Sequence, residues 1–228
     1  MRTTDLLRML QFGDSAFPVG AFSFSNGLES AIQHGVVHDL PTLGQFITSA
    51  VDQAATVDGI ALLVAHRAAC QANLGAVIDA DHALLQRKLN EQMRTMTTRM
   101  GRKLAEIATH MLDAKMAPEW LSSIRDGVTP GTHPVGLGVV FAELGLDERQ
   151  AFAAHQYGIA SMMLGAALRL MRVSFMDTQA VLLEINSTAE DAYERIADAS
   201  LDQMAGFTPL SDIVAASHLH AHVRMFMN

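Results

Sequence analysis

The residues whose types could support chemistry are ten histidines, a single cysteine and scattered carboxylates. Only the histidines near the C-terminus form a cluster, as His218-x-His220-x-His222. On a helix, His218 and His222 would share one face, which is the spacing of a two-histidine metal site, and nickel binds imidazole readily. These two are therefore candidate ligands of a weak surface metal site, although a polar tail can also carry histidines that bind nothing. We expect each of the other seven histidines to be solvated or hydrogen-bonded.

The residue types and their spacing give little support for a catalytic site. Asp14, Glu29 and His34 could supply an acid–base pair near one loop, but their spacing fits no catalytic pattern. Asp14 is better placed to cap a turn, and Glu29 falls in the first turn of an expected helix, where the helix dipole favours a carboxylate. The sequence contains no Gly-x-x-x-x-Gly-Lys-Ser/Thr loop, no Gly-x-Ser-x-Gly elbow and no His-Glu-x-x-His. We therefore expect a protein that is not an enzyme, with no catalytic residue and no cofactor.

Composition and charge exclude several classes of protein. The chain has 228 residues, half of them hydrophobic, so it can form a sizeable core and is not disordered. A net charge of −8 without any basic cluster argues against nucleic-acid binding. One cysteine, Cys70, allows no internal disulfide and no cysteine-based zinc site. Because neither a secretory signal nor an uncharged apolar run of membrane-spanning length is present, we expect a cytoplasmic protein with no membrane contact.

The hydrophobic pattern predicts helices throughout. Fourteen methionines and only one tryptophan and two tyrosines favour helix over strand. Apolar residues recur every three or four positions over residues 43–54, 93–111 and 152–170, whereas no alternating run is long enough for a sheet. We predict an all-α fold, a single-domain helical bundle of about eight to ten helices over residues 1–228. The tail from about residue 218 should be poorly ordered alone and should fold against a partner.

Two kinds of local signal add detail. Glycines inside the long apolar stripes indicate places where another helix packs closely against the helix. They are Gly101, Gly158 and Gly165. Ser187 followed by Glu190 predicts a capping box at the start of a further helix.

The segment from Asp14 to Gly27, called the opening loop below, differs from the rest of the chain. Three phenylalanines, at positions 17, 22 and 24, alternate with small and turn-forming residues. Because surface loops are mostly polar, a loop this aromatic is either buried as a wedge in the helical core or exposed as a contact surface. Ser25 or Asn26 is well placed to cap the helix that follows.

Residues 14–29 read Asp-Ser-x-Phe-Pro-x-Gly-x-Phe-x-x-Ser-x-Gly-Leu-Glu, which resembles the N-terminal signature of the UreF family of urease accessory proteins. Later segments are similar to the family in the same order, so the resemblance spans the chain. These segments are Arg94 to Leu104, His133 to Leu146, Arg169 to Gln179 and Pro209 to Phe226.

The chain departs from the family pattern in two places. Arg172, Ser174 and Thr178 stand where the family usually has Pro, Gly and Gly, which predicts a more continuous helical connection there. Leu219 stands where the family has Glu, so the role of that carboxylate is absent or supplied elsewhere.

The resemblance implies an all-α, usually dimeric scaffold that binds UreD (also called UreH) and recruits the nickel-carrying GTPase UreG. Together these proteins dock on apo-urease and deliver nickel, and the scaffold couples GTP hydrolysis by UreG to metal release. Two other classes stay open: a helical metal-dependent hydrolase, and a metallochaperone that binds nickel directly through the tail histidines.

The resemblance and the loop composition together predict partner-binding residues in two groups. The first group should face UreG, with two arginines as neighbours, and comprises Phe22, Ser23, Ser25, Asn26, Gly27, Glu29, Arg94 and Arg99. The second group lies on the tail, should bind UreD and comprises His218, Arg224, Met225 and Phe226. Under this hypothesis alanine at Ser25 or Glu29 leaves the fold intact and weakens UreG recruitment.

Overall fold

The computed structural model describes residues 2–206, 208–217 and 225–227. Within these ranges the regular secondary structure is entirely helical, which confirms the all-α prediction. The elements in chain order are α1 (Thr3–Gly13), η1 (Ala21–Ser23), α2 (Leu28–Gln33), α3 (Leu40–Ala54), η2 (Ala55–Gly59), α4 (Ile60–Cys70), α5 (Leu74–Arg87), α6 (Glu91–Met111), α7 (Met116–Arg125), α8 (His133–Glu143), α9 (Glu148–Leu170), α10 (Phe175–Asn186), α11 (Ala189–Ile196), η3 (Leu201–Gln203) and α12 (Pro209–Ser217).

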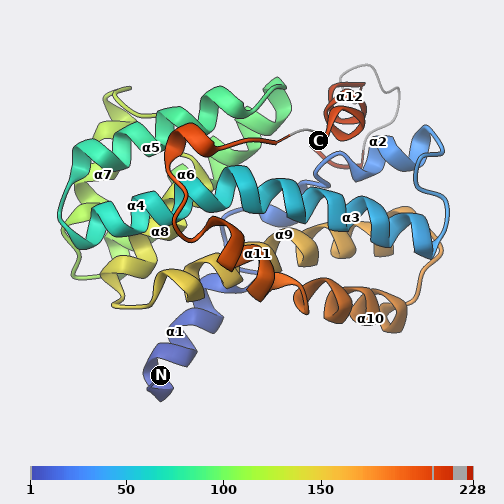
Figure 1. Cartoon of the computed structure of the whole chain (residues 1–228), viewed down its shortest axis with the longest axis horizontal. Helices are drawn as coiled ribbons and strands as arrows, with labels where there is room; N and C mark the ends of the chain where they lie inside the picture. Colours follow the sequence, from blue (N-terminus) through green and yellow to red (C-terminus); the bar gives the residue numbers. More distant parts are fainter. Residues whose placement is uncertain (1, 207, 218–224, 228) are drawn as a thin grey trace.

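The bundle is built around α3 and α4, which the π-helical turn η2 joins into one rod across the middle of the molecule (Figure 1). Asp39 caps the start of this rod by accepting a hydrogen bond from Thr42 N at 2.9 Å. The rod spans Leu40–Cys70, and it alone among the described helices is long and apolar enough to cross a membrane. However, 67% of its most apolar window is buried within the protein, as expected of a core helix.

Helix α8 lies at the centre of the core and is buried on all sides, from Pro134 through Phe141. It packs against α4 and α6. Gly138 permits the contact with α4, because a Cβ atom at this position would lie 2.5 Å from the Leu62 carbonyl oxygen. A side chain of any size would therefore separate the two helices.

The predicted close approach at Gly101 is confirmed, but its partner is a loop. A Cβ atom at Gly101, in the middle of α6, would lie 2.1 Å from the Gly131 carbonyl oxygen in the segment that precedes α8. The carboxylate of Asp81 on α5 holds the same segment by accepting hydrogen bonds from the backbone amides of Gly131 and Thr132, both at 2.8 Å. The start of α8 is thus fixed between α5 and α6.

Several other local predictions are wrong. No atom lies within 4 Å of a Cβ built at Gly158 or Gly165, so neither glycine marks a close approach. Thr188 is the N-cap of α11, and Ser187 donates instead to the Glu184 carbonyl at 2.6 Å, so no capping box forms there.

The connection from α9 to α10 is not a continuous helix. The chain leaves the helical conformation at residues 171–174, and a new helix begins after Ser174. Ser174 makes this break, because its hydroxyl accepts a hydrogen bond from Asp177 N at 3.1 Å while the Asp177 carboxylate accepts one from Ser174 N at 2.9 Å.

Candidate functional site

The opening loop is partly buried and partly exposed. Asp14 caps its first turn by accepting a hydrogen bond from Ala16 N at 2.9 Å, as the sequence predicts. The ring of Phe17 packs on Phe12, with centroids 5.0 Å apart. Phe24 is fully inside the core, whereas the Phe22 side chain is 71% exposed. The loop therefore serves both as a wedge, through two of its rings, and as a presenting surface for the third.

The loop is joined to the C-terminal end of the chain by three backbone hydrogen bonds. The Glu29 carboxylate accepts one from Met225 N at 2.7 Å and one from Phe226 N at 3.0 Å. Ser23 O accepts the third, from Met227 N at 2.8 Å. We call these contacts between residues 22–29 and 225–227 the terminal clasp. A buried carboxylate that accepts successive amides is a strong and directional anchor.

Arg169, near the end of α9, completes the terminal clasp. Its guanidinium lies 4.1 Å from the centre of the Phe226 ring, and its Nη2 atom donates to Phe22 O at 3.0 Å. It therefore holds the tail by a cation–π contact and the loop by a hydrogen bond. Arg169 is named above only as the start of a segment similar to the family and not as a site residue, because both of its partners are distant in the chain.

The structure corrects the predicted exposure of several site residues. Ser25 and Glu29 are 0% and 2% exposed, so they lie inside the protein, and Gly27 is covered by Ala215 of α12. Ser25 Oγ caps α2 by accepting from Glu29 N at 3.3 Å. Phe226 is buried as well, so this residue packs onto the body of the protein. Residues 218–224 lie outside the described residues, and the predicted order of the tail stays a prediction.

The remaining predicted site residues lie elsewhere. Arg94 is half-buried and donates to Lys88 O at 2.7 Å, which ties α6 to the end of α5, and Arg99 is exposed on α6. Among the described residues, no hydrogen bond or ion pair joins either arginine to the terminal clasp. His218, His222 and Arg224 lie outside the described residues. Asn26 borders the cavity considered below.

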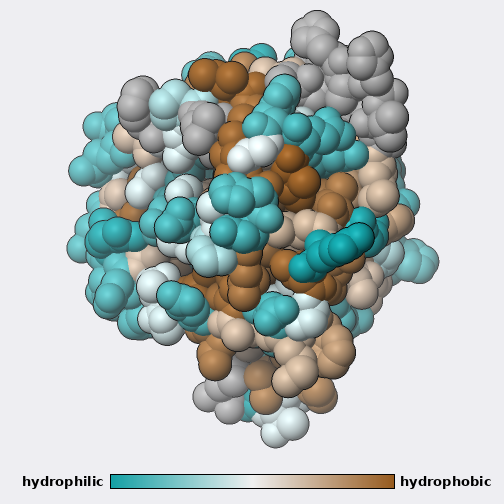
Figure 2. Space-filling model, turned by 90° about the vertical axis from the view of Figure 1, so that its right-hand side faces the viewer, coloured by the Kyte–Doolittle hydropathy of each residue, from teal (hydrophilic) through white to brown (hydrophobic). Residues whose placement is uncertain are grey.

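Exposed apolar side chains surround the terminal clasp. Phe22, Met225 and Met227 are 71%, 59% and 51% exposed, and each belongs to a residue whose backbone the clasp holds in place. Figure 2 shows the face at the α2 and α12 end of the molecule, where apolar side chains form a band between polar ones. We call Phe22, Met225 and Met227 the clasp surface. Fixed, exposed aromatic and methionine side chains are typical of a protein-binding patch.

We expect Glu29→Ala to release the tail, because two tail amides lose their acceptor at once. The expected loss of stability is about 1–3 kcal/mol, the usual cost of removing a hydrogen-bonded buried partner. Hydrogen exchange at the amides of Met225 and Phe226 should become at least about tenfold faster. Glu184→Ala, at an exposed carboxylate on α10, is the matched control. Unchanged protection of the tail amides in Glu29→Ala would show that the clasp does not hold the tail.

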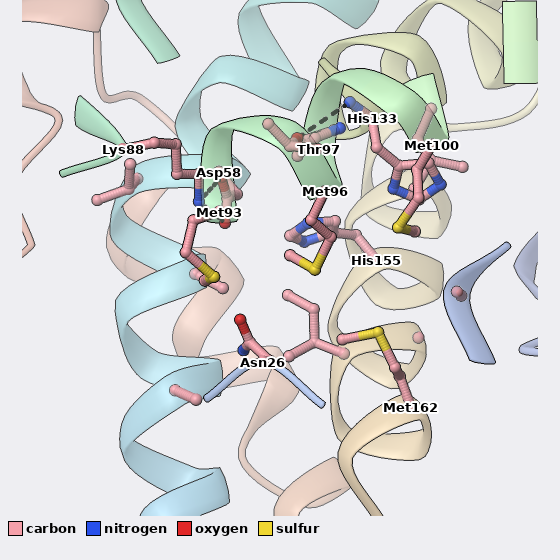
Figure 3. Close-up of a pocket in the computed structure, with 18 of the residues that line it drawn as sticks. Asn26, Asp58, Lys88, Met93, Met96, Thr97, Met100, His133, His155 and Met162 are labelled. Atoms are coloured by element: carbon pink, nitrogen blue, oxygen red, sulfur yellow. Dashed lines mark hydrogen bonds and ion pairs between the residues drawn. The ribbon is translucent and has the colours of Figure 1, made fainter. Parts of the chain in front are cut away.

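A cavity of about 390 Å³ that opens to the surface lies between α6, α8, α9 and the α3–η2 segment, and residues of the opening loop border it (Figure 3). Five methionines line it, three from α6, one from α9 and one from the segment after η3: Met93, Met96, Met100, Met162 and Met204. The sequence predicts the α6 methionine stripe as core packing, and only the tertiary structure shows that it borders a space large enough for a ligand.

Two histidines and one ion pair are among the polar groups of the cavity wall. Burial lowers the pKa of His133 to about 3, with a further decrease from His155. Burial also lowers the pKa of His155 to about 4, although Asp58 opposes this decrease. Both rings are therefore uncharged at neutral pH. Asp58 and Lys88 neutralise each other, with Nζ and Oδ1 2.6 Å apart.

These two histidines make few polar contacts. His133 is half-buried, and its ring makes no hydrogen bond to any described residue. His155 has only a long contact, from Gln156 Nε2 to its Nδ1 at 3.4 Å. Nothing in the sequence distinguished them from the other scattered histidines. Among the described residues, no group of three or more His, Cys, Asp or Glu is arranged to hold a metal ion.

Comparison with known proteins gives a consistent result. A family model described as UreF matches residues 37–186. The chain is 60% identical over 223 residues to urease accessory protein UreF 2 of Brucella canis, covering 98% of this chain and 92% of that protein. It is 59% identical over the same shares to UreF 1 of Brucella melitensis, and 48% identical to UreF of Yersinia enterocolitica, where the match spans all of both chains.

Proposed function

Because the chain belongs to the UreF family of urease accessory proteins, we propose that it acts in urease maturation as a non-catalytic, cytoplasmic scaffold. In this proposal it forms a homodimer, binds UreD (UreH) and recruits the GTPase UreG. The assembled complex docks on apo-urease and delivers nickel to it. The scaffold makes and breaks no bonds itself, and it couples GTP hydrolysis by UreG to metal release.

The clasp surface is the observation that carries the proposal. Its three apolar side chains are exposed, yet the terminal clasp fixes their backbone: Glu29 holds Met225, Ser23 O holds Met227 and Arg169 holds Phe22. Because the backbone of these residues is already ordered, binding a partner costs little further conformational entropy there, which favours affinity. Because the loop and the tail end form one surface, one partner must contact both groups of residues that the sequence predicted separately. We assign UreD to this surface.

UreG recruitment is then expected at another place. Arg99 on α6 is exposed, so it offers a charged position for a second partner. Exposed charges mainly steer association and set specificity. We therefore propose the Arg99 side of α6 for UreG, with Arg94 supporting the α5–α6 junction behind it.

The double substitution Phe22→Ala/Met225→Ala should weaken UreD binding by at least about tenfold, because truncating central apolar contacts usually costs more than about 1 kcal/mol each. The measurement is the affinity of the purified full chain for UreD. Leu183→Ala on α10 is the control, because Leu183 is equally apolar and is 74% exposed outside the clasp. The fold should be unchanged, since the substituted side chains are not buried.

Two outcomes would contradict this assignment. Wild-type affinity for UreD in the double variant would remove the clasp surface from that interface. Normal UreD binding with failed UreG recruitment would move UreG to the clasp surface, while the scaffold function itself would still hold.

A further inference from the structure

The cavity wall carries soft donor atoms in an unusual concentration. Met100 and Met162 are 7% and 8% exposed, come from α6 and α9, and border the same space as Met96 (Figure 3). Thioether sulfur is a weak hydrogen-bond acceptor that hard cations do not use, but it is a preferred ligand of copper(I). Methionine also packs well as plain core, so the thioethers alone do not define a site.

The second observation is a buried imidazole with unused bonding capacity. His155 is 4% exposed and lines the cavity, and Nε2 makes no hydrogen bond to any described residue. His133, at the start of α8, borders the cavity from the other side and its ring likewise has no described partner. Because these rings line the cavity and have no described partner there, their nitrogens are available to a ligand or to ordered water in it.

The charges around the cavity select the kind of ligand. Its charged groups already have partners: Asp58 pairs with Lys88, Asp14 caps the turn at Ala16, and Arg87 donates to backbone carbonyls near η3. Asp14 and Asp58 are the only carboxylates among the described residues that line it, and Asp58 is already paired, which is too few for the oxygen-rich shell that calcium needs. Uncharged imidazole and thioether donors instead suit a soft cation of low charge, whose desolvation is less costly.

We propose that the cavity is a binding site for a soft monovalent cation of the copper(I) class. Its donors are drawn from the thioethers of Met96, Met100 and Met162 and the imidazoles of His133 and His155. A bound ion links α6, α8 and α9, which otherwise meet around an open space. This inference does not depend on the proposed urease function.

Silver(I) is the probe, because it has the same charge and donor preference as copper(I) and is not oxidised in air. The full-length protein carries C70S/H218A/H220A/H222A, which removes the exposed thiol and the tail imidazoles as competing ligands. Calorimetry in chloride-free buffer should show one-to-one binding, and the melting temperature should rise with silver concentration.

Met100→Leu/Met162→Leu should weaken silver binding by at least about tenfold, because leucine keeps the volume and apolar character of methionine but offers no donor. Met111→Leu/Met176→Leu is the control at two exposed methionines, which are 47% and 69% exposed. In protein labelled with ¹³C at the methionine methyl groups, silver should shift the resonances of the cavity methionines and leave those of Met111 and Met176 unchanged.

Three results would overturn the inference. The first is no silver binding in the background that lacks the thiol and the tail imidazoles. The second is equal affinity in the cavity and control variants, while circular dichroism shows both to be folded. The third is nickel(II) binding more tightly than silver(I) with the same dependence on the cavity methionines, which would reassign the site to a harder ion.

Discussion

Asp81→Ala should lower the free energy of unfolding by about 3–5 kcal/mol, the usual cost of breaking a buried charged network by removing one partner. Asp81 is 0% exposed, and its carboxylate accepts five hydrogen bonds. Three are from side chains: Trp120 Nε1 at 3.2 Å, Thr129 Oγ1 at 2.7 Å and Thr132 Oγ1 at 2.6 Å. Alanine leaves all of these donors buried without an acceptor.

Urea denaturation followed by circular dichroism measures this loss. Asp79→Ala on the same helix is the control and should change stability by less than about 0.5 kcal/mol, because Asp79 is exposed. Asp81→Asn should fall between the two, since the amide keeps one acceptor oxygen but turns a donor towards the other hydrogen bonds. An Asp81→Ala protein within about 1 kcal/mol of the wild type would show that the network does not hold the loop.

Gly101→Ala should also destabilise the protein by about 3 kcal/mol or more, at the upper end of the range for overpacked cores. The added Cβ would lie 2.1 Å from Gly131 O, 2.5 Å from the Thr132 carbonyl carbon and 2.6 Å from His133 N. All three are backbone atoms, so no side chain can rotate away to make room. The loop that Asp81 anchors must therefore shift, and His133 N then loses its hydrogen bond to Thr97 Oγ1 at 3.2 Å.

Gly165→Ala is the matched control, because Gly165 is also inside a long helix but has open space where the methyl group would go. In a helix interior alanine is more favourable than glycine by about 1 kcal/mol, so this variant should be as stable as the wild type or more stable. Thermal melts of the two variants should therefore move in opposite directions. A Gly101→Ala protein that melts at or above the wild-type temperature would rule out the close approach.

The sequence by itself determined the helices and much of the burial. The apolar stripe over residues 43–54 predicts the buried face of α3, and Asp39 predicts its start. The all-α fold follows from the same kind of signal. The sequence can predict these features because helix hydrogen bonds join residues four apart and a helix face repeats every three or four positions. The residues that determine a helix and its cap therefore lie within one short stretch of the chain.

Only the tertiary structure decided which residues form the candidate sites. The sequence analysis singles out Glu29 and Phe226 as separate residues. In the structure they belong to one clasp, although they are 197 residues apart in the chain. Because of that contact, Glu29 is a buried anchor and not an exposed recognition residue. Likewise, His133, His155 and the α6 methionines border one cavity through the packing of three helices. Contacts of this range leave no periodic pattern in the chain, because they depend on how helices pack and not on the order of neighbouring residues.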